Sequence, residues 1–134
     1  SHVLEHVPDD GQFLERLAST LEPGGLMINF VPIEPEGFDP KHIRTYSAGS
    51  LAALMSSLGL EIVHLESNYH ICFGPLKWMD HPVRHGWPIL QWLEGVRHAI
   101  LSPIPYGFTR KVEALLSKLG LPPNQALVIG RKIR

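Results

Sequence analysis

The chain has 134 residues, enough for one domain with a hydrophobic core, since 44% of its side chains are hydrophobic and 19% are charged. Twelve basic and 13 acidic residues nearly cancel, which argues against nucleic-acid or membrane-surface binding driven by bulk charge. No apolar run is long enough to span a membrane, no secretory signal is visible, and the single Cys72 cannot form an internal disulfide. We therefore expect a cytoplasmic protein.

The N-terminal part predicts a helix followed by a strand. Asp9 or Asp10 can cap a helix that runs to about Leu21 with apolar residues at helical spacing. The Pro-Gly-Gly sequence after it ends the helix, because proline cannot continue it and glycine accepts positive φ. The apolar run Leu26–Val31 then predicts a buried strand.

A second helix and strand follow a loop rich in proline and acid at residues 32–40. The helix is expected to start at Ser47 or Ser50 and to stop at Gly59, and Leu60–Leu65 is the next predicted strand. The strand–helix–strand order predicts an α/β fold, arranged as a three-layer sandwich.

The second half of the sequence is less regular. Pro88 at a first helical turn predicts a helix to about Leu101, and a further amphipathic helix is expected over Phe108–Leu119. Residues 125–133 read as a last strand. Five aromatic side chains could line a pocket for an aromatic or lipid-like acceptor, or could equally be core between helices and sheet: Tyr69, Phe73, Trp78, Trp87 and Trp92.

Three segments in this order carry a family resemblance: Leu-Glu-His-Val at residues 4–7, the Pro-Gly-Gly turn before Leu26–Val31, and His42-x-Arg44-x-Tyr46. Together they resemble the C-terminal portion of a class I, type 11/12-like S-adenosylmethionine-dependent methyltransferase. The resemblance is strong over residues 1–65 and returns only at the last strand. It implies a partial Rossmann-like sheet and S-adenosylmethionine as cofactor. The glycine-rich loop and the acidic ribose-binding residue of the family are not in this sequence, so this chain alone is expected to be incomplete.

The resemblance also implies a strand order. The family's sheet ends in an antiparallel pair of its last two strands, which Leu60–Leu65 and Ala126–Arg131 match. Leu26–Val31 would lie between the fourth strand of the family and the last strand. Residues 1–134 are then one domain, with residues 67–124 inserted as a helical cap or substrate-side insertion, or as a helical layer that only adds core. One edge of Leu26–Val31 is left without a neighbour, and this edge predicts either a homodimer or a poorly soluble fragment.

The opening segment holds the candidate cofactor and metal residues. By resemblance, Ser1, His2 and Val3 flank the cofactor. His2, Glu5 and His6 share a face if a helix includes them, and His42 is a distant partner. The group resembles the Glu-x-x-Glu-His metal site of small-RNA 2′-O-methyltransferases and ubiquinone-pathway O-methyltransferases, with His2 in place of a glutamate. Glu5, His6 and His42 would suit zinc better than magnesium. The alternative is that Glu5 and His6 only bond nearby backbone.

The remaining candidates concern the acceptor. Without a metal, His2 or His6 could act as a general base, because imidazole titrates near neutrality. By resemblance, His42, Arg44 and Tyr46 border the acceptor pocket, where Arg44 could bind a carboxylate or phosphate. Arg44 could instead pair with one of the acids of the preceding loop, which are Glu34, Glu36 and Asp39.

The sequence therefore predicts methyl transfer to a small-molecule oxygen, nitrogen or carbon, with the acceptor unspecified. A non-catalytic α/β fragment without the cofactor-binding half is the first alternative. The second is an interaction module that pairs through its exposed sheet edge. A glycine-rich strand–loop segment encoded upstream would favour the enzyme, and the mass in solution tests the interaction module.

Overall fold

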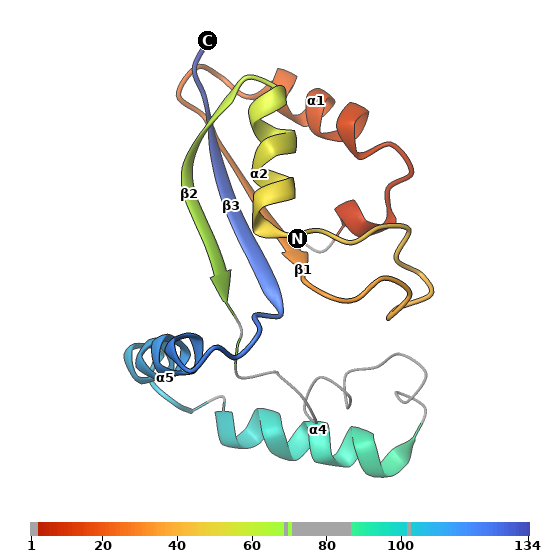
Figure 1. Ribbon diagram of the computed structural model, residues 1–134, viewed down its shortest axis with the longest axis vertical. Coiled ribbons are helices and arrows are strands. Elements are labelled where there is room, and N and C mark those ends of the chain that lie inside the picture. The colour runs from red at the N-terminus through yellow and green to blue at the C-terminus, as the bar shows by residue number, and fades with distance from the viewer. Residues whose placement is uncertain (1–2, 69, 71–86, 102) are drawn as a thin grey trace. The chain divides into compact units, whose positions relative to one another are not determined.

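The computed structural model describes residues 3–68, 70, 87–101 and 103–134 of a mixed α/β chain (Figure 1). None of the helices in these ranges is long and apolar enough to cross a membrane. The elements run in the order η1 (Leu4–His6, a 3-10 turn), α1 (Asp10–Thr20), β1 (Leu26–Pro32), α2 (Ala48–Ser57), β2 (Leu60–Asn68), α4 (Pro88–Leu101), α5 (Tyr106–Lys118) and β3 (Gln125–Lys132).

The chain forms two compact units. The sheet unit comprises Ser1–Asn68 and Asn124–Arg134, and the helical unit comprises Tyr69–Pro123. The helical unit thus occupies almost the same residues as the predicted insertion. Its role as a cap or substrate-side insertion stays a prediction.

β3 is the central strand of a three-stranded sheet of order β1-β3-β2. It runs antiparallel to both neighbours. Leu26 of β1 lies opposite Arg131 of β3, and Leu60 of β2 lies opposite Lys132 of β3. β1 and β2 therefore run parallel to each other, with α2 connecting them. The pairing confirms the two neighbour relations that the family resemblance implied.

Local side-chain bonds set where the two helices of the sheet unit begin. The Asp9 carboxylate accepts a hydrogen bond of 2.9 Å from the backbone N–H of Gln12, so Asp9 is the N-cap of α1. Ser47 and Ser50 form a reciprocal capping box at the start of α2. Both starts agree with the sequence, because capping depends on residues three positions apart.

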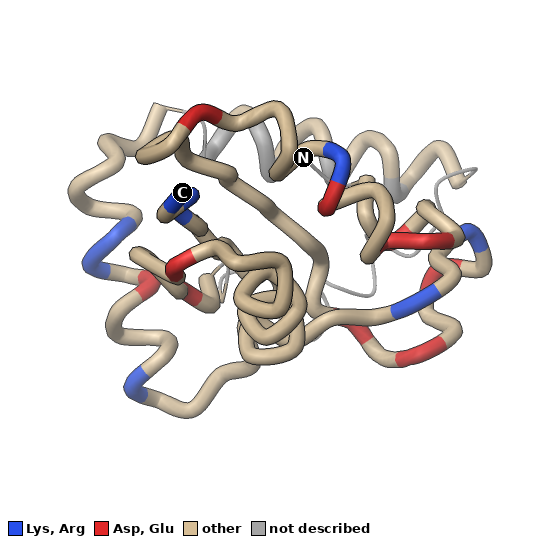
Figure 2. Tube along the Cα trace, turned by 90° about the horizontal axis from the view of Figure 1, so that it is seen from above, with Lys and Arg blue, Asp and Glu red and all other residues tan. Residues whose placement is uncertain are grey.

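The helices cover one face of the sheet. Leu14 and Leu51, from α1 and α2, pack in one core with Val31 and Val128. α2 carries no charged residue, and in Figure 2, which looks down the helix, its coil is entirely tan. On the opposite face Leu26 and Ile28 are each 52% exposed. The described residues of this unit therefore make two layers, and the third layer of the predicted sandwich stays a prediction.

The opening segment does not belong to the first α-helix, so the condition for a shared helical face of His2, Glu5 and His6 is not met. Leu4–His6 form a single 3-10 turn, and Val7 is extended with φ −88° and ψ 122°. Pro8 explains this break, because the ring of a proline disfavours helical backbone in the residue before it. Glu5 and His6 therefore do not share an α-helical face, and any common site for them depends on tertiary contacts.

β2 is longer than the predicted strand and contains a β-bulge. It extends to Asn68, and its register with β3 shifts between Ile62 and His64. The bulge places an extra residue in β2, so the regular alternation of side chains between the two faces of the strand is interrupted after Ile62. A bulge depends on the partner strand and leaves little signal in the sequence of its own strand.

Gly130 has no room for a side chain. A Cβ there would lie 2.9 Å from Met55 Cε and 3.1 Å from Leu60 Cβ. We predict that Gly130→Ala lowers the free energy of unfolding of the sheet unit by about 1–3 kcal/mol through overpacking. Urea unfolding followed by circular dichroism measures this. Gly49→Ala on the exposed side of α2 is the matched control, and its midpoint should stay or rise slightly. Equal midpoints for the two variants would contradict the packing argument.

Candidate functional site

Glu5, His6 and His42 come together at the η1 turn. Each offers a ligand atom, and the three atoms lie within 4.8 Å of one another. The rings of His6 and His42 meet edge to face, with centroids 4.7 Å apart. The backbone N–H of Ile43 donates to the carbonyl of Glu5 at 2.8 Å, which joins the loop after β1 to the turn. The loop therefore brings His42 to the pair that lies 36 residues earlier.

Hydrogen bonds orient both imidazoles. Nδ1 of His6 lies 3.1 Å from the carbonyl oxygen of Lys41, which only accepts, so the proton is assigned to Nδ1 and the lone pair to Nε2. Nδ1 of His42 bonds the Glu34 carboxylate, and its Nε2 lies 3.7 Å from a carboxylate oxygen of Asp39. A histidine that binds a metal usually donates its other N–H to a carbonyl or carboxylate, as both rings do here.

The donor set fits a divalent metal ion. Glu5 is 1% exposed, and a carboxylate this deep in the protein needs charged or polar partners around it. Two imidazole nitrogens and one carboxylate oxygen match three-ligand zinc sites, which leave a fourth position for water or substrate. Magnesium prefers oxygen ligands alone, so this group suits it less well.

A second cluster holds the end of the same loop against α1. The Arg44 guanidinium pairs with the Asp10 carboxylate and also donates to the carbonyl oxygen of Pro8 at 2.6 Å. The Tyr46 hydroxyl donates to the other oxygen of Asp10 at 2.6 Å. The partner of Arg44 is thus an acid of the first helix, not one of the three loop acids that the sequence suggested. The loop acids were closer in sequence, but folding brings Asp10 closer in space.

This second cluster alters the ionisation of its members. Burial raises the pKa of Tyr46 well above its ordinary value, and the hydrogen bond to Asp10 raises it further. Burial also acts to raise the pKa of Asp10, but hydrogen bonds from Tyr46 and Arg44 together hold that pKa below its ordinary value. Arg44 and Tyr46 therefore form a structural lock, and their contact with an acceptor stays a prediction.

Several predicted residues cannot be placed at either cluster. Ser1 and His2 lie outside the described residues, and so do Tyr69, Phe73 and Trp78. Val3 is exposed and precedes the η1 turn directly. Trp87 and Trp92 are each more than half exposed in the helical unit, so they are not core, and their place in an acceptor pocket stays a prediction.

Sequence reasoning missed three groups that support the two clusters. Glu34 and the Lys41 carbonyl orient the two histidines, and Asp10 anchors Arg44 and Tyr46. A metal-binding histidine needs an acceptor for its second N–H, so a search for acids in the loop before His42 could have found Glu34. No sequence pattern identifies a backbone carbonyl as such a partner.

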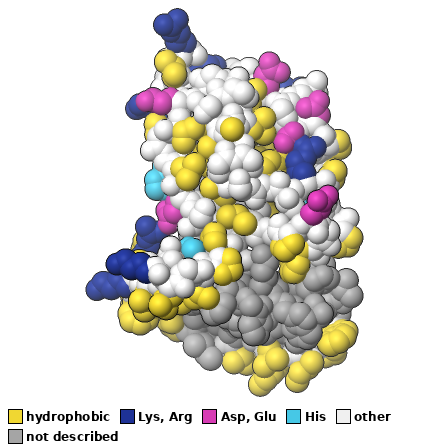
Figure 3. Space-filling model, viewed as in Figure 1, with side chains coloured by type: hydrophobic (Ala, Val, Ile, Leu, Met, Phe, Trp, Pro, Cys, Tyr) yellow, Lys and Arg dark blue, Asp and Glu magenta, His cyan; other side chains and the backbone are white. Residues whose placement is uncertain are grey.

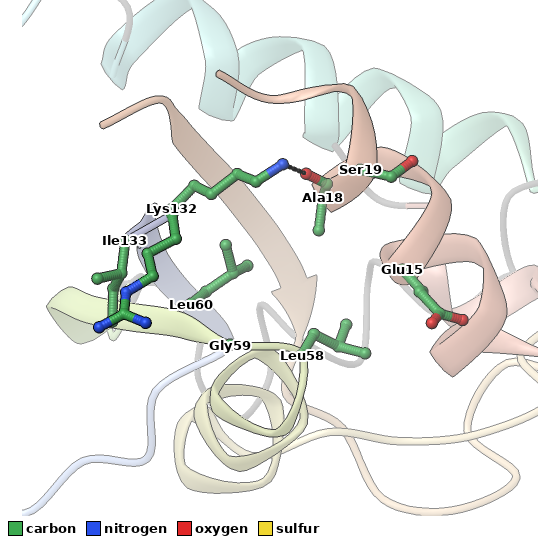
Figure 4. Close-up of a pocket in the computed structure, with 9 residues that line it drawn as sticks. Glu15, Ala18, Ser19, Leu58, Gly59, Leu60, Lys132 and Ile133 are labelled. Carbon is green, nitrogen blue, oxygen red and sulfur yellow. Dashed lines mark hydrogen bonds between the residues drawn. The ribbon is translucent and has the colours of Figure 1, made fainter. Parts of the chain in front are cut away.

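A hollow of about 560 Å³ lies elsewhere in the sheet unit (Figure 4). Its walls come from the end of α1, the turn between α2 and β2, and the last residues of the chain: Glu15, Ala18, Ser19, Leu58, Gly59, Leu60, Lys132, Ile133 and Arg134. The Lys132 ammonium donates to the carbonyls of Ala18 and Leu21, at 3.0 and 2.8 Å. Lys132 thus closes the end of α1, and none of the predicted site residues lines this hollow.

No family model and no curated protein matches the sequence. Among solved structures, the fold is similar to a Galdieria sulphuraria protein provisionally assigned as a sarcosine dimethylglycine methyltransferase, with a TM-score of 0.52 and 18% identity. The match covers 98% of this chain and 50% of that one, so the chain spans about half the length of that protein. At this identity the likeness establishes the fold alone.

The Asp10 cluster predicts a pH-dependent stability. We expect Asp10→Asn to lower the free energy of unfolding by about 1–2 kcal/mol at pH 7, because charge-assisted bonds to Arg44 and Tyr46 weaken. The folded pKa of Asp10 is lowered, so its contribution is full above the unfolded pKa of about 4 and disappears as pH falls through the folded pKa. The gap between wild type and variant, measured by urea unfolding, should therefore close below about pH 4.

Asp9→Asn is the matched control for this experiment. Asp9 is the neighbouring residue and caps α1, and asparagine caps helices about as well as aspartate does. Its unfolding midpoint should stay near wild type across the same pH range. If both variants lose the same free energy of unfolding, the bonds of Asp10 to Arg44 and Tyr46 do not stabilise the fold.

Proposed function

We propose that this chain is the C-terminal portion of an S-adenosylmethionine-dependent methyltransferase that acts on a small-molecule acceptor. The observation that supports this most strongly is the strand order, in which β3 lies antiparallel between β1 and β2. That order is the one implied by the family resemblance of the sequence. The similar solved structure supports the same family through its fold.

The outer edge of β1 is where further strands of a methyltransferase sheet would pair. Backbone hydrogen bonds join Ile33 N–H to Asn124 O and Lys132 N–H to Gly25 O, at the two ends of the β1–β3 pair. In this register the odd-numbered residues of β1 direct their N–H and C=O groups toward β3. Leu26, Ile28 and Phe30 consequently turn their N–H and C=O groups away from β3. No strand among the described residues pairs with that edge. We infer that the preceding strands of the methyltransferase sheet add there.

A second copy of the chain could occupy the same edge when those strands are absent. The predicted homodimer would then be a property of the isolated 134 residues rather than of the whole enzyme. The mass of the chain in solution, measured by light scattering, distinguishes a monomer from this dimer.

The residues of this chain would act on the acceptor side of the reaction. The cofactor, when bound, supplies a methyl group on a positively charged sulfur. By family resemblance Ser1, His2 and Val3 would border it, and they lead directly into the turn that carries Glu5 and His6. Methyl transfer depends mainly on alignment of the acceptor with the methyl group, so a turn tied to the following loop by the bond from Ile43 N–H to the Glu5 carbonyl would be useful beside it.

We also propose that Glu5, His6 and His42 hold a zinc ion near the acceptor. A zinc ion supplies Lewis acidity, which lowers the pKa of a hydroxyl bound to it. Glu34 and the Lys41 carbonyl would keep the two imidazoles in the tautomers that binding requires. Without the ion, His6 or His2 would accept the proton of the acceptor directly.

Calorimetry with S-adenosylhomocysteine tests the main proposal. The 134-residue chain should show no micromolar binding, because the family's glycine-rich loop and ribose-binding acid are not in its sequence. A chain extended upstream through a glycine-rich strand–loop segment should bind. Micromolar binding by the 134 residues alone would contradict the proposed division of the fold. An extended chain that folds and does not bind would favour the non-catalytic alternative.

Zinc titration tests the metal proposal separately. We predict one bound Zn²⁺ per chain, a loss of at least about tenfold in affinity for His6→Ala or His42→Ala, and a loss of about 10- to 100-fold for Glu34→Gln. His64→Ala is the control, because His64 is exposed and its ring lies 3.1 Å from the nearby Glu66 carboxylate, away from the three proposed ligands. Wild-type affinity in the His6 and His42 variants would rule out this site.

A further inference from the structure

The helical unit exposes an apolar stripe along α5. Phe108, Leu115 and Leu119 are 57%, 57% and 68% exposed. Their spacing of seven and four residues places them above one another on the same side of the helix. The helix has a different inner side, because Thr109, Val112 and Leu116 are partly covered. The exposed stripe is therefore an additional apolar surface beside the one that packs inside the unit.

Two lysines lie directly beside this stripe. Lys111 follows Phe108 by three residues, and Lys118 follows Leu115 by three, so both border the stripe on the outward side of α5. Both are exposed. The helix holds three basic residues and one acidic residue, whereas the whole chain has a net charge of −1. Two of the three basic residues of α5, Lys111 and Lys118, therefore border the apolar stripe, and Arg110 lies on another side of the helix.

α4 presents a second exposed apolar surface on the same unit. Ile89, Trp92 and Leu93 fall on one side of the helix, and the first two are more than 60% exposed. Trp87, just before the helix, is 53% exposed. Figure 3 shows hydrophobic side chains over both helices at the lower end of the view, with Lys and Arg side chains beside those of α5.

We propose that the helical unit docks on an anionic lipid surface through α5 and α4. Apolar side chains bordered by lysines are the pattern of helices that lie in the interface plane of a bilayer. Tryptophan and tyrosine prefer this zone because their rings are apolar with one polar group. Helices of 14 and 13 residues, neither suited to crossing a membrane, fit an in-plane arrangement. The charge favours anionic lipid over a neutral apolar partner. The inference does not depend on methyl transfer.

Vesicle flotation tests the proposal with the 134-residue chain. We expect the chain to float with vesicles of phosphatidylcholine and phosphatidylglycerol and to bind much less to phosphatidylcholine alone. Phe108→Ser, Leu115→Ser and Leu119→Ser combined should reduce binding at least tenfold. Lys111→Glu with Lys118→Glu should remove the preference for the anionic vesicles, since each lysine near such a surface contributes about fivefold. High salt should weaken the wild type in the same direction.

Control variants separate lipid binding from general stickiness. Ile43→Ser with Leu17→Ser removes exposed apolar side chains from the sheet unit and should leave flotation unchanged. Circular dichroism of each variant checks that the helices are retained. No flotation by the wild type, or equal binding to both vesicle types, would overturn the proposal. A wild-type dimer that the stripe variant turns into a monomer, without vesicle binding, would assign the stripe to protein contact instead.

Discussion

The antiparallel insertion of β3 between β1 and β2 is the constraint on which the sheet unit depends. β1 and β2 do not bond each other, so this three-stranded sheet forms only when β3 pairs with both of them. Gly130 lets α2 approach this central strand closely, and Lys132 closes the end of α1. The contacts of β3 with β1 span about a hundred residues of sequence, and such long-range pairing generally slows folding. The entropy cost of closing a loop grows only slowly with its length, so a long insertion is compatible with this sheet.

The cluster of Glu5, His6 and His42 is a consequence of how this sheet ends. The loop after β1 is fixed at its start by the bond from Ile33 to Asn124, next to β3. Its far end is fixed by Arg44 on Asp10, and Ile43 joins it to the turn of Glu5. Three backbone and side-chain contacts therefore define the path that brings His42 to His6. The geometry of the site depends on these contacts more than on any regular element, since both histidines lie outside α-helices and strands.

The features that could be predicted from the sequence depend on neighbouring residues or on family resemblance. Asp9 and Ser47 cap helices through residues three positions away, and the strand bounds agree to within a few residues. The features that were missed depend on distant partners. Pro8 ends the opening turn after His6, so Glu5 and His6 do not belong to an α-helix. The loop after β1 nevertheless brings His42 to His6. Arg44 pairs with Asp10 because the fold brings the two side chains together, and the spacing of residues in the sequence does not reveal this distance.

The outer edge of β1 and the apolar stripe of α5 suit different partners, because their backbone hydrogen-bonding groups are in different states. At the edge of β1, the N–H and C=O groups of Leu26 and Ile28 face away from β3, and only another strand can satisfy all of them at once. Along α5 the backbone groups are bonded within the helix, so Phe108 and Leu115 can enter a medium that offers no hydrogen bonds. A protein strand therefore suits the first surface, while lipid acyl chains are sufficient for the second. The lysines of α5 that border the stripe then select lipids with negative head groups.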